Sequence, residues 1–244
     1  GSDPFDFTLL LKKPMSDQYI DENIKGKLNL AQVTKFVKLS GDTKLSGLLD
    51  ADATAKGNVA VITQQKPGPF TANGFINITD LNYSSSDFPQ PIKNSRVQIQ
   101  FENPDGVPDH TVINIPAGHI EIGNDPVDFN VLLKTPATDP SFDGRAKGKF
   151  NLGTVSQFTT LEPGTSVSGM INADVSFKGN KSSIDKSQYE KINTAGTLNI
   201  SDLVYKSKDY PDGVKVDEAA FTFNPKNITL NNLKAVYLTS NITA

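Results

Sequence analysis

Hydrophobic and polar positions alternate along much of this chain, and the alternation predicts a protein made mainly of β-strands. Over residues 45–56, leucines, a glycine and alanines fall on one face, and mostly polar residues fall on the other. Residues 167–178 repeat the pattern with larger apolar side chains, from Val167 to Phe177. A period of two held this long is typical of a strand with one buried face.

The chain contains an internal duplication. Residues 3–58 align without a gap with residues 125–180 at an offset of 122 (125 − 3), and 26 of the 56 aligned residues are identical. Self-similarity at one fixed spacing indicates a structural unit present in tandem copies. We therefore predict two β-groove repeats, residues 1–122 and residues 123–244.

Apolar residues spaced by three to four positions predict one short helix in each unit, over residues 30–39 and again over 152–161. The later connectors differ between the copies. Residues 59–70 contain two prolines and are predicted to be a loop. In the second unit, Ser183 is predicted to cap the N-terminus of a further short helix.

The phase of the alternation changes at Thr79-Asp80 and again at Ser201-Asp202, which predicts a β-bulge or bend at the same place in each unit. The fold predicted is mainly β: two tandem repeats of a curved antiparallel sheet of about six strands, each with one short helix, forming a groove or half-barrel. One such helix covers only about a quarter of an apolar sheet face. The remainder must pack on another sheet or stay open, and composition alone favours a closed sandwich.

Composition excludes several classes of function. The net charge is −3 with both signs interspersed, so no basic stripe for nucleic acid or polybasic membrane patch is present. The chain has no cysteine, which rules out disulfides and thiolate metal sites. No apolar run approaches the 18 or so residues of a membrane-spanning helix.

No catalytic motif is found, so we expect no enzyme activity, no cofactor and no metal. The sequence lacks GxSxG, a P-loop and HExxH. His110 and His119 are expected to be surface or turn residues. Asp50 and Asp52 lack the spacing of a calcium loop and are expected on the polar face of a strand.

Several motifs together resemble the AsmA-like family of Gram-negative envelope proteins. They are FDGRAKGKFNL (142–152), VSGMINADVSFKGN (167–180), GTLNISDLVYKSKDYPDGV (196–214) and FTFNPKNITLNN (221–232). The resemblance implies a very large protein with an N-terminal inner-membrane anchor that lies outside this sequence, so the chain would be an internal fragment. It also implies a periplasmic repeating β-sheet that carries phospholipid along a groove in outer-membrane biogenesis, without a catalytic motif.

The hypothesis from the sequence is therefore a periplasmic segment that binds phospholipid or other acyl chains in an apolar β-groove for lipid transport. The alternative is a structural or assembly module of the cell envelope, with a sealed core and a protein partner. The candidate lipid-binding residues share one apolar face: Val127, Phe129, Val131, Phe150, Leu152, Val167, Ile171, Val175, Phe177, Leu198, Ile200, Phe221 and Phe223. Four lysines are expected to be solubilising charges, with contact to lipid head groups as the alternative: Lys25, Lys27, Lys147 and Lys149.

Overall fold

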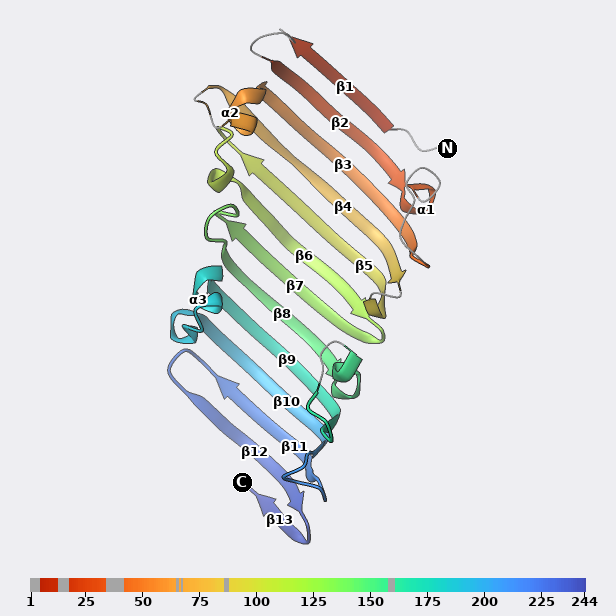
Figure 1. Cartoon of the computed structure of the whole chain (residues 1–244), viewed down its shortest axis with the longest axis vertical. Coiled ribbons are helices and arrows are strands. Elements are labelled where there is room, and N and C mark those ends of the chain that lie inside the picture. Colours follow the sequence, from red (N-terminus) through yellow and green to blue (C-terminus); the bar gives the residue numbers. More distant parts are fainter. Residues whose placement is uncertain are drawn as a thin grey trace.

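The computed structural model describes residues 5–12, 18–33, 42–64, 66, 68–85, 88–157 and 161–244. In this part of the chain, thirteen strands form one antiparallel sheet whose spatial order follows the sequence from β1 to β13 (Figure 1). The strands are β1 (Phe5–Lys12), β2 (Tyr19–Asn29), β3 (Lys44–Asn58), β4 (Phe70–Ser85), β5 (Phe88–Asn103), β6 (Val112–Ile122), β7 (Asp125–Lys134), β8 (Ser141–Asn151), β9 (Ser166–Asn180), β10 (Asn193–Lys206), β11 (Val214–Phe223), β12 (Ile228–Tyr237) and β13 (Ser240–Thr243). The mainly β, antiparallel prediction is confirmed.

The strands form where the alternating pattern predicts them. β2 and β8 have the same bounds at the offset of 122, since 19 + 122 is 141 and 29 + 122 is 151. β3 and β9 also coincide at this offset, because 44 + 122 is 166 and 58 + 122 is 180. β6 pairs with β7, so the sheet runs without a break across the predicted boundary at residue 122.

The helical segments are short and lie at the ends of the strands, along the two long margins of the sheet (Figure 1). They are α1 (Leu30–Val33), α2 (Val59–Gln64), α3 (Lys181–Asp185) and the 3-10 turns η1 (Pro108–His110), η2 (Leu152–Gln157) and η3 (Tyr189–Lys191). The prediction of one short helix in each half is therefore wrong, since each half has several. Such short segments at the margins leave the middle of the sheet uncovered.

Two predictions about the connectors are also wrong. Residues 59–70 contain the helix α2 (Val59–Gln64), which precedes both prolines of this segment in the sequence. Ser183 is not the N-cap of α3. The N-cap is Asn180, and Ser183 is a buried residue inside the helical segment. The helix predicted over 30–39 is described only as α1, and residues 34–41 lie outside the described part.

In the second half, the helix predicted over 152–161 is described only as the 3-10 turn η2 (Leu152–Gln157). Residues 158–160 lie outside the described part of the chain.

The two predicted β-bulges are confirmed. The pairing register of β3 with β4 shifts between Ser46 and Leu48, and that of β9 with β10 shifts between Ser201 and Val204. Asp80 and Asp202, at equivalent positions, have φ angles of 51° and 52°. Aspartate tolerates this left-handed conformation better than most residues.

The described strands form a single layer. β1 pairs only with β2 and β13 only with β12, so the sheet does not close on itself. The closed sandwich favoured by composition, and the sealed core of the alternative hypothesis, are therefore not formed by the described residues. Searched over the same residues, the chain has no helix with the length and apolar character needed to span a membrane.

Candidate functional site, the apolar face of the sheet

The two faces of the sheet have opposite chemical character. Residues directly opposite each other in an antiparallel pair project to the same face, so the pairing register assigns each paired strand position to one face. Val127, for example, pairs with Gly148, which pairs with Ala173, which pairs with Leu198. We call the face that includes Val127 the apolar face and the opposite one the polar face.

One unbroken row of apolar residues and glycines crosses the apolar face from β2 to β12, perpendicular to the strands. Its members, each paired with the next, are Leu28, Leu49, Ile78, Val97, Gly118, Phe129, Ala146, Val175, Gly196, Phe223 and Ile228. Ten steps between neighbouring strands make this central row ~48 Å long. No charged residue interrupts it.

Glycines on the apolar face make room for aromatic rings that lie across the sheet. A Cβ atom on Gly118 would lie 2.4 Å from Cζ of Phe129, so the Phe129 ring occupies that space. In the same way, a Cβ on Gly144 would lie 3.0 Å from Cζ of Phe177. Phe177 also meets Phe142, with ring centroids 6.0 Å apart. Because the rings lie over glycines instead of projecting outward, they level this face.

The apolar face remains largely accessible. Most of its residues are half-buried, and Phe150 and Ile228 are 41% and 77% exposed. Only six apolar side chains of the described part are buried: Ala51, Val61, Phe70, Val127, Ala219 and Ala235. The chain exposes 15284 Å², whereas a compact protein of 26.4 kDa exposes ~10,600 Å². The excess is what a single layer with an uncovered face produces.

Twelve of the thirteen candidate residues lie in strands, and the register places all twelve on the apolar face. Val127, Phe129 and Val131 are in β7, and the others follow in β8 to β11. Leu152 is the exception, because it begins the turn η2 at the margin of the sheet. It does not lie on the same strand surface as the other residues.

The sequence-based set omitted the first-half residues of the same face, including Leu28, Leu49 and Ile78 of the central row. The offset of 122 could have found them, because it matches these residues to Phe150, Ile171 and Ile200. In β6, the register shifts between Ile115 and Gly118. This irregularity breaks the simple alternation of apolar and polar residues. The sequence pattern therefore did not reveal which β6 residues lie on the apolar face.

The polar face carries cross-strand ion pairs. Lys25 Nζ lies 2.7 Å from Asp52 Oδ2, and Lys27 Nζ lies 3.8 Å from Asp50 Oδ2. In the second half, Arg145 Nε lies 2.6 Å from Asp174 Oδ1, and this guanidinium lowers the pKa of the Asp174 carboxyl. The expected position of Asp50 and Asp52 on a polar strand face is confirmed.

Lys147 and Lys149 also project from the polar face, opposite Asp174 and Asn172. All four lysines considered from the sequence therefore lie on the side of the sheet opposite the apolar face. They do not surround the surface on which acyl chains would lie.

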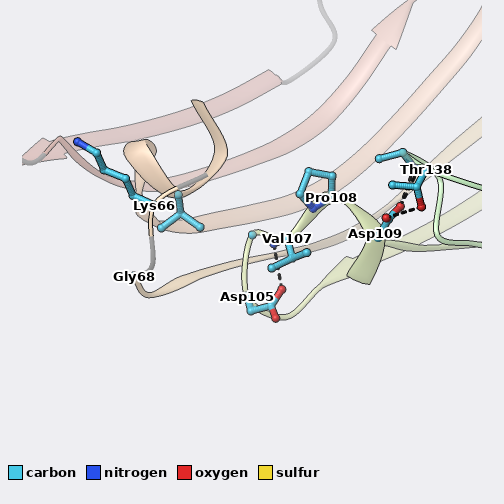
Figure 2. Close-up of a pocket in the computed structure, with 10 residues that line it drawn as sticks. Lys66, Gly68, Asp105, Val107, Pro108, Asp109 and Thr138 are labelled. Atoms are coloured by element: carbon cyan, nitrogen blue, oxygen red, sulfur yellow. Dashed lines mark hydrogen bonds between the residues drawn. The ribbon is translucent and has the colours of Figure 1, made fainter. Parts of the chain in front are cut away.

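The loops at one margin of the sheet enclose a hollow of about 560 Å³, between α2, the β5–β6 loop and the β7–β8 turn (Figure 2). Asp109 closes one end: its Oδ1 accepts hydrogen bonds from the backbone N–H groups of Ala137 and Thr138, both at 3.0 Å, and its Oδ2 accepts one from the Thr138 hydroxyl at 2.6 Å. Asp105 is bonded to His110 and to the Val107 N–H. Asp109 thus joins two loops and Asp105 holds the shape of its own loop, so both carboxylates already have partners and the hollow presents mainly apolar walls.

Asp139 joins the β7–β8 turn to α3. It accepts hydrogen bonds from the Ser182 N–H at 2.9 Å, the Ser182 hydroxyl at 2.8 Å and the Asn180 side chain at 3.2 Å. The pKa of the Asp139 carboxyl is lowered, and the hydrogen bonds from Ser182 are the main cause. The margin loops are thus tied by aspartates to one another and to the strand ends.

Both histidines have carboxylate partners. His110 Nδ1 lies 2.6 Å from Asp105 Oδ2 in the turn η1, where a turn residue was expected. His119 belongs to β6 and lies 2.7 Å from Asp128 Oδ1 on the polar face. Within the described part of the chain, no group of three histidine or acidic residues is suited to hold a metal ion.

Fold and site together define a class of protein: an open, single-layer antiparallel sheet with one polar face and one uncovered apolar face. The chain matches no protein-family model, no curated protein and no solved structure.

Proposed function

We propose that this chain is a periplasmic segment of an AsmA-like envelope protein that binds phospholipid acyl chains on its apolar face and passes them along it. The observation that carries the proposal is the central row, which is apolar and uncovered over ~48 Å. The motif resemblance supports the family, the inner-membrane anchor outside this sequence and a role in outer-membrane biogenesis. In this proposal the two tandem units are consecutive segments of one continuous groove, and the protein is a carrier and not an enzyme.

The energetics of lipid transfer favour such a surface. Each buried CH₂ contributes about 0.8 kcal/mol, so a sixteen-carbon chain leaving water gains roughly 12 kcal/mol. A track that keeps this gain from end to end must be continuous and free of charge, because a buried unpaired charge costs more than several CH₂ groups return. The central row meets both conditions.

The levelled surface also favours lipid over a tightly fitting protein partner. Protein cores gain stability when side chains interdigitate at close-packed density. Phe129 and Phe177 lie over glycines of neighbouring strands and do not project as knobs. Flexible acyl chains adapt to a level surface and can slide along it without meeting deep pockets.

A pair of charge variants tests the proposal. Ile171 lies on the apolar face and Asn172, the next residue, lies on the polar face. We expect Ile171→Asp to weaken binding of a fluorescent phospholipid about tenfold or more, because the carboxylate would be buried against acyl chains. Asn172→Asp adds the same charge to the same strand and should bind like the unmodified chain.

Protein purified from cells should also release phospholipid on extraction with organic solvent, and far-ultraviolet circular dichroism should show that both variants keep the sheet. An unmodified chain that carries no lipid and binds none in the titration would contradict the proposal.

A further inference from the structure

The apolar face is large enough for a permanent protein interface. Thirteen strands at ~4.8 Å spacing span ~62 Å, and ten residues of strand span ~33 Å, which gives ~2,000 Å² for one face. Two such faces in contact would bury ~4,000 Å² in total, within the range of about 2,000–5,000 Å² found for obligate homodimers. The area therefore suffices for a stable association.

The chemistry of the face also suits an interface core, in which charged residues are depleted. Among strand residues with described side chains, the register places two charged residues on this face, Glu22 and Asp125. Asp125 lies at the margin, where its Oδ2 accepts a hydrogen bond from the Asn151 N–H at 2.8 Å. Glu22 is in β2, next to the edge strand β1.

The central row is arranged evenly about the middle of the sheet. Phe129, in the seventh of the thirteen strands, has five row residues before it and five after it. A two-fold axis that lies between two copies and passes beside Phe129 brings the row of one copy onto the row of the other. Such an isologous contact is closed, so it stops at two copies.

We propose that, when no lipid is bound, a second copy of this chain covers the apolar face and forms a closed face-to-face dimer. The two polar faces, with their ion pairs, then lie outward in water. The level surface around Gly118 and Gly144 gives the two sheets little to interdigitate, so area and not close fit holds the dimer. Acyl chains compete with the second copy for the same surface. This competition, unlike the dimer itself, rests on the proposed function.

Sedimentation velocity of the delipidated protein tests the dimer directly. We expect a dimer at micromolar concentration and a monomer after addition of phospholipid–detergent micelles. Because the chain has no cysteine, single cysteines report on the contact. Ala146→Cys, beside Phe129 on the apolar face, should form a disulfide between copies on oxidation, whereas Lys147→Cys on the polar face should not.

Val131→Asp and Asn130→Asp provide the matched pair of variants for the same experiment. Both are in β7, on the apolar and the polar face respectively. Val131→Asp places a carboxylate from each copy near the axis and should raise the dissociation constant at least about tenfold. Asn130→Asp should leave it unchanged, and circular dichroism should show an intact sheet in both.

The outcomes separate this inference from the proposed function. A delipidated chain that stays monomeric but binds lipid overturns the dimer and leaves lipid binding standing. A dimer that never binds lipid does the reverse. A series of species larger than a dimer, unaffected by Val131→Asp, would indicate pairing through the sheet edges and would also overturn the inference.

Discussion

The two halves of the apolar face share a backbone plan but differ in the size of the apolar side chains they carry. β3 and β9 have the same length and aligned bounds. Where β3 presents three successive alanines to the apolar face, β9 presents progressively larger side chains: Ala51, Ala53 and Ala55 against Ala173, Val175 and Phe177. The second half therefore offers more apolar surface to a bound chain.

The halves also differ in charge at one equivalent position. Glu22 in β2 places a carboxylate on the apolar face, opposite Ala55. At the offset of 122 this position is Gly144, which lies beneath the Phe177 ring. The strand pairing is therefore the same with a glutamate as with a glycine, but at Gly144 the ring of Phe177 occupies the space that a side chain would need. We expect the tightest acyl binding on the second half.

Exchanging the two residues should have the largest effect. A Cβ on Gly144 would lie 2.4 Å from the Asn130 carbonyl oxygen and would displace the Phe177 ring. Gly144→Glu should therefore lower the free energy of unfolding by about 2–4 kcal/mol through overpacking and a poorly solvated carboxylate. Urea unfolding followed by circular dichroism measures the change.

The reverse exchange is the control for this comparison. Glu22→Gly removes a charge from the apolar face and should cost no more than about 1 kcal/mol, the usual penalty for glycine in a strand. If Gly144→Glu and Glu22→Gly changed the free energy of unfolding equally, the position of the Phe177 ring would not depend on a glycine at 144. The difference between the halves would then lose its structural basis.

The bulges should respond alike in the two halves. Gly47 has φ +132° and Gly169 has φ +123°, and an added Cβ would lie 2.9 Å from Leu81 Cα and 2.7 Å from Leu203 Cα, respectively. We expect Gly47→Ala and Gly169→Ala each to cost about 1–3 kcal/mol, because alanine meets both strain and a backbone contact. Thermal unfolding of the single and double variants checks this.

If only one of these two substitutions lowers the free energy of unfolding, the two bulges are not equivalent. The halves would then be less alike than their alignment at the offset of 122 suggests. Gly153→Ala provides a milder reference, because its added Cβ would meet only the Asn151 side chain, at 3.1 Å.

Much of the fold follows from the sequence because strand faces and bulges are local properties. The alternation predicts β3 and β9, and its change of phase predicts the bulges at Asp80 and Asp202. The helices were predicted less well, because segments as short as α2 depend on contacts with the strand ends more than on intrinsic propensity. A proline that follows such a segment limits its length but does not prevent it.

The candidate site was predicted as a face but not as a complete surface. Periodicity assigned Ile171 and Phe177 to the same face as Leu198, and the register agrees. Periodicity within one strand cannot show that a single layer leaves this face uncovered, since a sandwich core has the same pattern. That distinction depends on long-range pairing, which places β1 and β13 at opposite edges of one sheet.

The smallest effect we predict concerns the margin loops, where Asp109 joins η1 of the first half to the β7–β8 turn and Asp139 joins that turn to α3. Hydrogen bonds from Thr138 lower the pKa of Asp109, and those from Ser182 lower the pKa of Asp139, both from 3.8. A lowered folded-state pKa means that the stabilisation is present above pH 3.8 and is lost as the pH falls through the folded value.

The difference in unfolding free energy between the unmodified chain and Asp139→Asn, or Asp109→Asn, should therefore be constant from pH 5 to 7 and shrink below about pH 4. Urea unfolding at a series of pH values measures it, and the subtraction removes the contribution of the other carboxyl groups. A difference that does not change with pH would mean that the carboxylate charge is not what holds these margin loops together.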